Sequence, residues 1–184
     1  MAGRGGAKAT AHGLERPLPA MPRATARGLN FRPIATSDMR FLADLYAAGR
    51  AGEVAPLPWS AEQKAAFLRM QFEAQHAYYM AHYPDAHWLI ATIAERPVGR
   101  LYLECWPSEV RIIDIALLPD ARGMGLGTAM LEDVMALAAD AAKGVGIHVE
   151  HANRARRLYE RLGFRQVADQ GVYALMRWEP PPVR

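Results

Sequence analysis

Three glycines lie close together in the stretch Arg-Gly-Met-Gly-Leu-Gly-Thr at residues 122–128. The stretch follows an apolar run at 112–118, typical of a strand, and precedes a run at 129–142 that is typical of a helix. Glycine lets the backbone turn tightly and approach a ligand, and the first amides of a helix have no acceptor within it. These features predict a phosphate-binding loop, best suited to a diphosphate, made by Arg122, Gly123, Met124, Gly125, Leu126, Gly127 and Thr128.

The spacing of these glycines distinguishes between the known phosphate-binding motifs. A Rossmann fingerprint, G-x-G-x-x-G, starting at Gly123 would need a glycine where the chain has Thr128, and the Walker pattern would need Gly-Lys before Ser or Thr. The pattern that fits is R-x-x-G-x-G, which starts at Arg122. A second segment, residues 153–164, reads Asn-Arg-Ala-Arg-Arg-Leu-Tyr-Glu-Arg-Leu-Gly-Phe.

In this order and spacing, the two motifs resemble those of the GNAT-type N-acetyltransferases, which bind an acyl-CoA. The resemblance covers residues 29–178 and is strongest over residues 110–178. It implies an α/β (α+β) domain with a mixed, partly splayed sheet of about six to seven strands and about four flanking helices. It also implies acetyl-CoA as the acyl donor and a primary amine as the acceptor, with direct attack in a ternary complex and neither a metal nor a covalent enzyme intermediate.

The resemblance assigns roles on the donor side of such a site. The strand before the glycines would splay from its neighbour, and backbone amides would then bind the acyl oxygen and pantetheine. Tyr159 matches the family's general acid, although packing on a helical face explains a tyrosine there as well. Asn153 caps the helix that follows it and matches a cofactor contact, while Arg156 meets either phosphate or solvent. The strand positions concerned, whose apolar side chains a buried strand explains equally well, are Ile115, Ala116, Leu117 and Leu118.

The acceptor amine must lose a proton, and Asp114 is the first candidate for the base. It interrupts an apolar strand, where a buried carboxylate is costly unless it is bonded or functional. Simple alternation places it on the same face as Ile112 and Ala116, whereas a strand bulge would turn it to the opposite face. A water relay without any single base stays open as an alternative. The further candidates are Glu104, Glu53, His87 and His151.

Acceptor recognition is expected in the first two helices and their linker, as the resemblance implies. The acceptor would be an amine-bearing small molecule or peptide, and Glu53 could hold a cationic amine or lie in solvent. The histidines show no metal-ligand spacing. The residues assigned to acceptor binding are Tyr46, Arg50, Glu53, Trp59 and Glu104.

Hydrophobic periodicity and turn residues predict the elements around these motifs. Ser60 and Gln63 form a capping box for a long helix that ends near Tyr83, before Pro84. The strands at 87–94, 98–106 and 109–118 should form an antiparallel meander. Further strands are expected at 29–34, 147–151, 165–168 and 172–178, and helices at 38–49, 60–83, 129–142 and 153–162.

The length of 184 residues suits a single domain, an acyl-CoA N-acyltransferase domain at 29–184. Residues 1–28 carry a net charge of +4 against +3 for the whole chain, so the remaining part is nearly neutral, which argues against a nucleic-acid partner. We expect these residues to form a disordered basic tail; a leader extension or a start at Met21 stays open. Cys105 is the only cysteine, which favours a cytoplasmic protein, and no apolar run is long enough for a membrane helix.

Other functions stay open at this point. A domain of the same fold could bind acyl-CoA without catalysis, and a dinucleotide-binding oxidoreductase would need an acid such as Glu150 for the ribose. A macromolecular acceptor and a homodimer are also compatible with the sequence.

Overall fold

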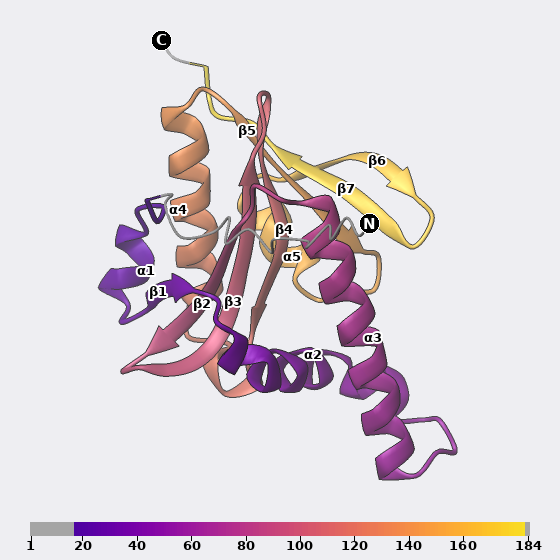
Figure 1. The fold of residues 1–184 in the computed structure, drawn as a ribbon. Helices are drawn as coiled ribbons and strands as arrows, with labels where there is room; N and C mark the ends of the chain where they lie inside the picture. The colour runs from indigo at the N-terminus through magenta and orange to yellow at the C-terminus, as the bar shows by residue number, and fades with distance from the viewer. Residues whose placement is uncertain (1–16, 183–184) are drawn as a thin grey trace, which may run out of the picture.

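The computed structural model describes residues 17–182, which form a single seven-stranded mixed sheet with helices on both faces (Figure 1). The strand order is β1-β2-β3-β4-β5-β7-β6, and within the described residues β4 and β5 are the one parallel pair. This confirms the predicted fold class. The strands are β1 (Asn30–Pro33), β2 (His87–Ile93), β3 (Arg96–Cys105), β4 (Glu109–Leu117), β5 (Gly144–Glu150), β6 (Arg165–Gln170) and β7 (Tyr173–Trp178).

The helices bury two separate cores against the two faces of the sheet. α4 lies on one face of the sheet, and α2 and α3 lie on the other (Figure 1). On the first face, Met130 and Val134 of α4 pack with Leu101 of β3; on the other, Leu42 of α2 and Phe72 of α3 pack around Tyr102. Alternate residues of β2 and β3 serve the two cores, because successive side chains of a strand point to opposite faces. The helices are α1 (Pro22–Ala26), α2 (Met39–Val54), α3 (Ala61–His82), α4 (Leu126–Asp140) and α5 (Arg156–Arg161), with 3-10 turns η1 (Thr36–Asp38) and η2 (Pro119–Ala121).

The capping box of the long helix is present as predicted. The Ser60 hydroxyl accepts the Gln63 amide at 3.2 Å, and the Gln63 side chain accepts the Ser60 amide at 2.8 Å. The predicted end of the preceding helix is wrong, because α2 passes Gly49 and Gly52 and continues to Val54. Val54 is buried, and this tertiary contact outweighs the roughly 1 kcal/mol that each helical glycine costs.

The N-terminal prediction is wrong for part of its range. Residues 1–16 lie outside the described residues, but α1 is an ordered helix beside α4, and Ala24 and Leu29 are fully buried in the first core. The cause is Asp133 on α4, whose buried carboxylate accepts the amides of Arg23 at 3.1 Å and Ala24 at 2.8 Å. No local pattern reveals an anchor this distant in sequence.

The splay between β4 and β5 is also present. The two strands pair only from Glu109 with Gly144 to Ile112 with Ile147, and β4 then continues to Leu117 alongside β3 alone. A register shift lies at this point, since Tyr102 pairs with Asp114 but Leu103 pairs with Ile112, which leaves Ile113 as the extra residue of a bulge. The bulge turns Asp114 to the α3 face, opposite Ile112.

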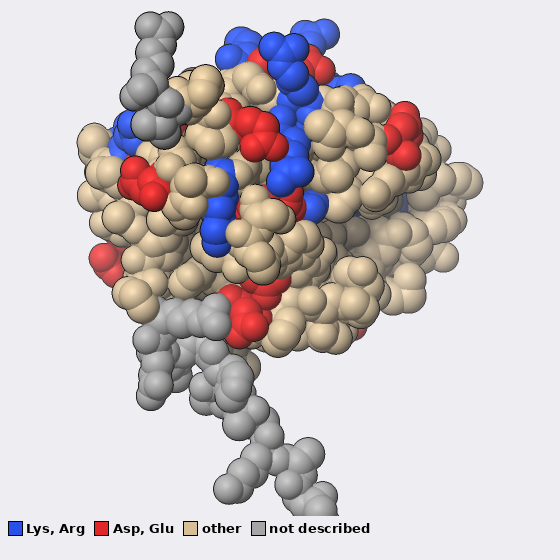
Figure 2. Space-filling view, turned by 90° about the horizontal axis from the view of Figure 1, so that it is seen from above, with Lys and Arg blue, Asp and Glu red and all other residues tan. Residues whose placement is uncertain are grey.

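Charges are mixed on the face seen from above in Figure 2. Basic side chains form a short band with acidic side chains beside it and uncharged surface around it. This face is therefore not a continuous basic surface of the kind that follows a phosphate backbone. None of the helices in residues 17–182 combines the length and apolar composition needed to cross a bilayer.

The folding stability of the protein at acidic pH should depend on the ionisation of Asp38. Arg32 donates two hydrogen bonds of 2.7 Å to this carboxylate and lowers its pKa, with help from the Ala35 amide. An aspartate whose pKa is lowered by folding stabilises the protein above its unfolded pKa, about 3.9, and this contribution is lost as the pH falls through the folded pKa. Urea midpoints measured from pH 6 to pH 2 should fall less steeply for Asp38→Asn than for wild type. Parallel curves would contradict this.

Candidate functional site

A cavity of about 710 Å³ opens where β4 and β5 separate. Its walls come from the end of β4, from α2 and α3, and from the segment that joins β5 to α5. A second hollow of about 690 Å³ between α2 and α3 contains none of the predicted site residues. The predicted residues that line the main cavity are Tyr46, Arg50, Glu53, Asp114, Ile115, Ala116, Arg122, Asn153 and Tyr159.

The glycine loop has the backbone that an anion site requires. Gly123 and Gly125 have φ values of +77° and +75°, a left-handed conformation that favours glycine. The first bond of α4 runs from the Ala129 amide to the Gly125 carbonyl at 3.0 Å, so the amides of residues 126–128 precede the hydrogen-bond ladder. A Cβ on Gly123 would meet no atom within 4 Å. The loop therefore presents its free amides and the positive end of α4, with open space beside Gly123 and the Arg27 guanidinium beside Gly125.

The end of β4 offers only some of the predicted amides. The Leu118 amide donates to the Val98 carbonyl at 2.8 Å, so the prediction that it binds a donor is wrong. Since amides alternate along a strand, Ala116 also faces β3, whereas Ile115 and Leu117 face the side that β5 has left. Arg122 is fixed at the same place, because its Nε donates to the Leu117 carbonyl at 2.8 Å.

Tyr159 projects from α5 into the cavity and is otherwise enclosed. Its residue is only 4% exposed, and its ring packs edge-on against Phe164 at 5.7 Å between centroids. Burial, followed by the nearby Asp114 carboxylate, raises the pKa of the hydroxyl far above its usual value. The side chain is therefore a neutral proton donor over the whole physiological range of pH.

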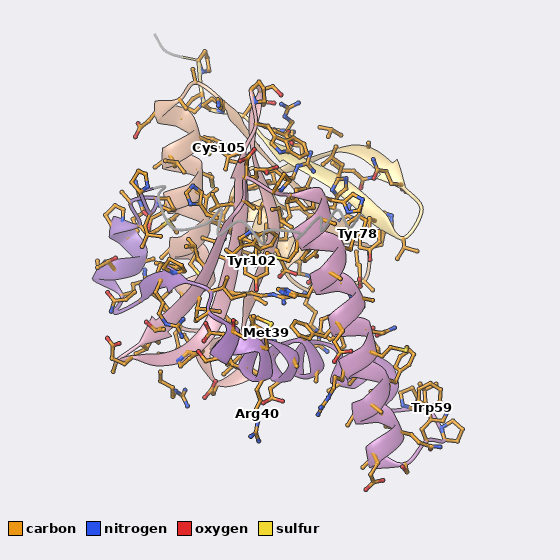
Figure 3. All side chains as sticks on the ribbon, in the orientation of Figure 1. Met39, Arg40, Trp59, Tyr78, Tyr102 and Cys105 are labelled. Atoms are coloured by element: carbon orange, nitrogen blue, oxygen red, sulfur yellow. The ribbon has the colours of Figure 1, made fainter. Side chains whose placement is uncertain are left out.

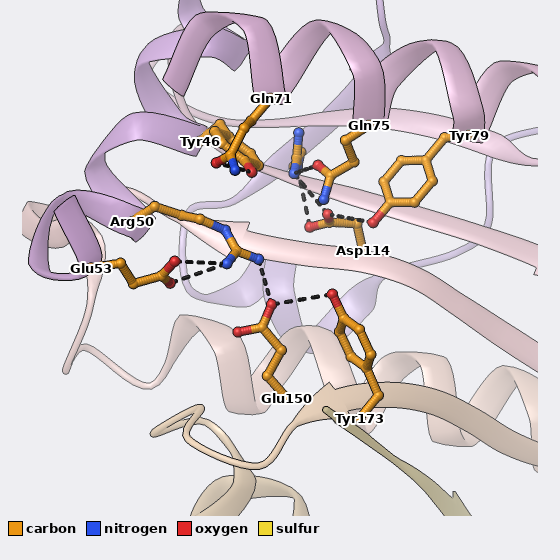
Figure 4. A network of polar contacts seen from close by, with 10 residues as sticks. Tyr46, Arg50, Glu53, Gln71, Gln75, Tyr79, Asp114, Glu150 and Tyr173 are labelled. Carbon is orange, nitrogen blue, oxygen red and sulfur yellow. Dashed lines mark hydrogen bonds and ion pairs between the residues drawn. The ribbon is translucent and has the colours of Figure 1, made fainter. Parts of the chain in front are cut away.

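Asp114 lies in the cavity as part of a buried ion pair. Arg100 donates to one oxygen from Nε at 3.1 Å and to the other from Nη2 at 2.7 Å, and the Tyr79 hydroxyl donates at 3.3 Å (Figure 4). Arg100 also donates to the Gln75 side chain at 3.1 Å. Both carboxylate oxygens of Asp114 are thus already engaged.

A second polar group joins α2 to the end of β5 across the cavity. Arg50 donates to Glu53 at 2.9 Å and pairs with Glu150, whose same oxygen accepts the Tyr173 hydroxyl at 3.4 Å (Figure 4). The guanidinium lies over the Tyr46 ring, 5.5 Å from its centroid. The other oxygen of Glu150 has no bond among the described residues, and the side chain is 22% exposed.

Three predicted site residues lie elsewhere. Trp59 packs on Phe67 at the start of α3, far from the sheet (Figure 3). Glu104 is buried between the Asp85 amide and the Trp106 indole. The predictions for both residues are wrong, because Trp59 packs on Phe67 and Glu104 bonds to Asp85 and Trp106, away from the cavity.

Arg156 is also directed away from the cavity. It joins α5 to its surroundings by bonds to Glu160 at 3.2 Å, His151 at 3.0 Å and Gln166 at 2.6 Å. Arg154 lines the cavity in its place. The prediction that Asn153 caps the helix is wrong, because α5 begins at Arg156 with Ala155 as its N-cap; the Asn153 side-chain oxygen accepts the Ala155 amide at 2.9 Å in the turn before the helix.

Sequence reasoning missed Arg100, Tyr79 and Tyr173, and assigned Glu150 only to the rival oxidoreductase. Arg100 interrupts an apolar strand just as Asp114 does, and pairing the two interruptions across the meander could have revealed the ion pair. The lining by Tyr79 and Tyr173 depends on helix and hairpin placement, for which the sequence carries no comparable signal.

Substitution of Gly125 should weaken binding of an anion at the loop. Gly125→Ala places a Cβ on a residue with positive φ, which costs roughly 1–2 kcal/mol, and the added atom would lie 2.9 Å from the Arg27 guanidinium. We expect about a tenfold higher Kd for CoA in calorimetry. Gly171→Ala, at a comparable φ of +76° in the β6–β7 turn, tests strain without the loop. Unchanged CoA affinity in Gly125→Ala would rule out this reading of the loop.

Comparison with known proteins adds a family and a set of similar structures. Residues 84–166 match the model of the acetyltransferase (GNAT) domain. PaiA N-acetyltransferase from Thermoplasma acidophilum, solved in complex with coenzyme A, is 14% identical with a TM-score of 0.63, and the match covers 83% of this chain and 99% of that one. An acetyltransferase from Thermus thermophilus is 18% identical with a TM-score of 0.61, covering 83% and 97%.

A further similar structure is described as histone acetyltransferase HPA2 and related acetyltransferase, from Corynebacterium glutamicum. It is 22% identical with a TM-score of 0.57, covering 85% of this chain and 98% of that chain. At these identities the likeness shows the fold. A search of curated proteins finds no significant match.

Proposed function

Because this chain carries a GNAT acetyltransferase domain, matched over residues 84–166, we propose that it transfers an acetyl group from acetyl-CoA to a primary amine. The observation that supports this most directly is the continuity of the main cavity. It joins the free edge of β4 and Arg122, suited to a donor, to the polar side chains of α2 and β5, suited to an acceptor.

The glycine loop and the end of β4 fit a CoA donor. The amides of residues 126–128 and Arg122 are suited to the diphosphate, and the free edge of β4 at Ile115 and Leu117 is suited to the pantetheine and the acyl oxygen. When bound, acetyl-CoA supplies an activated thioester carbonyl. An amide donor held toward the acyl oxygen favours the transition state, in which negative charge develops on that oxygen.

Tyr159 is positioned to assist the leaving group. A thiol has a reference pKa of about 8.5, so its thiolate leaves more easily when a neighbouring group donates a proton or a hydrogen bond. The buried, neutral hydroxyl of Tyr159 is such a donor in the cavity. Its proton would pass to the sulfur as the carbon–sulfur bond breaks.

We assign deprotonation of the acceptor to Glu150 rather than to Asp114. Asp114, the first choice from sequence, has both oxygens engaged by Arg100 and Tyr79. Glu150 retains an oxygen without a bond among the described residues, lies at the open end of β5 and lines the cavity. Asp114 and Arg100 then act as positioning residues that hold α3 against β4.

Removal of the Glu150 carboxylate should slow transfer without weakening donor binding. Glu150→Gln is expected to lower kcat/KM about 100-fold at neutral pH, the usual scale of general-base loss, while calorimetry gives an unchanged Kd for CoA. Glu150→Gln has no carboxylate to accept the proton of the amine. Its remaining activity should therefore recover as the pH rises and more of the amine is neutral. Glu73→Gln on α3 is the control. Wild-type kinetics in Glu150→Gln would remove Glu150 from this role.

The function itself is tested with the full chain and a panel of amines. Release of free thiol from acetyl-CoA is followed for small amines, amino acids and peptides, with mass spectrometry of the acetylated product. Acceptor-dependent thiol release confirms the proposal. Tight CoA binding without transfer to any amine would favour the non-catalytic alternative, and absence of CoA binding would reject the proposal altogether.

A further inference from the structure

The α1 segment is fixed to the body of the domain at both ends. Asp133 of α4, 1% exposed, accepts the amides of Arg23 and Ala24, and the Arg23 side chain lies 3.3 Å from the same carboxylate. After α1 the chain turns at Gly28, with φ of +84°, and enters β1, which pairs with β2. This segment lies outside the matched residues 84–166, yet Ala24 and Leu29 are fully buried in the first core.

This anchoring brings Arg27 to the glycine loop. The three atoms nearest to a Cβ built on Gly125 all belong to Arg27: Nη1 at 2.9 Å, Cζ at 3.3 Å and Nη2 at 3.8 Å. Arg27 is exposed, and among residues 17–182 its side chain has no hydrogen-bond or ion-pair partner. The backbone behind it is held by its own amide, which donates to the Ala24 carbonyl at 3.0 Å.

This placement brings two positive groups together, and an anion would be attracted to both. The guanidinium lies against the positive end of α4, and Arg122 directly precedes the same loop in the sequence. The carboxylate of Asp120, two residues before Arg122, is paired with Arg96 at 2.8 Å and is not paired with Arg27. A phosphate between the loop amides and Arg27 would satisfy both, because the planar guanidinium binds two phosphate oxygens at once.

We infer that Arg27 binds a phosphate of the CoA donor, so that the N-terminal segment 22–28 forms part of the donor site. The inference rests on the proposed function. It adds to the backbone loop a side chain from outside the matched region. Since a hydrogen bond between charged groups contributes more than a neutral one, loss of Arg27 should be visible in CoA affinity.

The test is calorimetric titration of the full chain with CoA, 3′-dephospho-CoA and pantetheine. Arg27→Gln should raise the Kd for CoA at least about tenfold, with Arg27→Lys intermediate, because lysine keeps the charge but not the fork of donors. Pantetheine, which has neither the diphosphate nor the 3′-phosphate, should bind wild type and Arg27→Gln equally. An equal loss for CoA and dephospho-CoA assigns Arg27 to the diphosphate, and a loss for CoA alone assigns it to the 3′-phosphate.

Arg69→Gln on α3 is the control, since it removes the same charge from an exposed arginine that lines the second hollow and has no ion pair among the described residues. Equal CoA affinity in wild type and Arg27→Gln would overturn the inference, and so would an equal loss in Arg69→Gln or a loss of pantetheine binding. Failure of wild type to bind CoA would instead reject the proposed function, and this inference with it. Thermal unfolding of each variant checks that α1 remains docked.

Discussion

Tyr159→Phe should lower kcat for acetyl transfer by about 100-fold or more, within the usual range for loss of a general acid. The substitution removes one oxygen and leaves the ring in place. The ring packs against Phe164 and is buried, so the fold of α5 should not change. What is lost is the proton donor on the cavity wall, which assists the thiolate only as the carbon–sulfur bond breaks.

The measurement is a comparison of kcat with donor affinity. Thiol release at saturating acetyl-CoA gives kcat, and calorimetry gives a Kd for CoA that should stay within about twofold of wild type, as expected for a group that acts in the transition state. Tyr78→Phe removes the same atom from an exposed tyrosine of α3 and should have no effect. A donor with a more acidic leaving thiol should recover part of the lost rate. Wild-type kcat in Tyr159→Phe would mean that water or another group protonates the thiolate.

Breaking the pair of Arg100 and Asp114 should give the largest loss of stability. The two side chains are 5% and 14% exposed and lie 2.7 Å apart. Removing one partner of such a pair leaves an uncompensated buried charge, which usually costs about 3–5 kcal/mol. Arg100→Met should therefore lower the free energy of unfolding by roughly this amount, and because Asp114 faces the cavity, activity should fall as well.

A double-mutant cycle measures the coupling. Arg100→Met combined with Asp114→Leu should be more stable than Arg100→Met alone, because the charge left behind by the single change is removed. Arg96→Met, which breaks the exposed pair with Asp120, should leave the urea midpoint unchanged. Strict additivity of the two core substitutions would show that Arg100 of β3 and Asp114 of β4 do not stabilise each other.

Local signals identified most of the elements and the donor loop. The Ser60 capping box, the three-stranded meander and the glycine loop before α4 depend on contacts between residues close in sequence. The errors are of a different kind: Gly49 does not end α2 because Val54 is buried, and Leu118 is lost as a donor because β3 takes its amide.

Several features of the cavity and of the core come from contacts that no sequence window contains. Arg50 meets Glu150 from 100 residues away, and Ala24 meets Asp133 from 109 residues away. The bulge at Ile113 is a property of the pairing of β3 with β4, and it alone decides which face receives Asp114. Simple alternation and a bulge are both compatible with the sequence of β4. Only the pairing of β4 with β3 shows which face of the sheet Asp114 occupies.

The amino-acid sequence thus determined the glycine loop with its free helix amides and the place of Tyr159 in α5, because glycine conformation, helix capping and periodicity act over a few residues. Tertiary structure alone decided which charged groups surround the cavity. Buried charges and backbone amides take whichever partner packing brings near, and that partner is set by the arrangement of whole strands and helices.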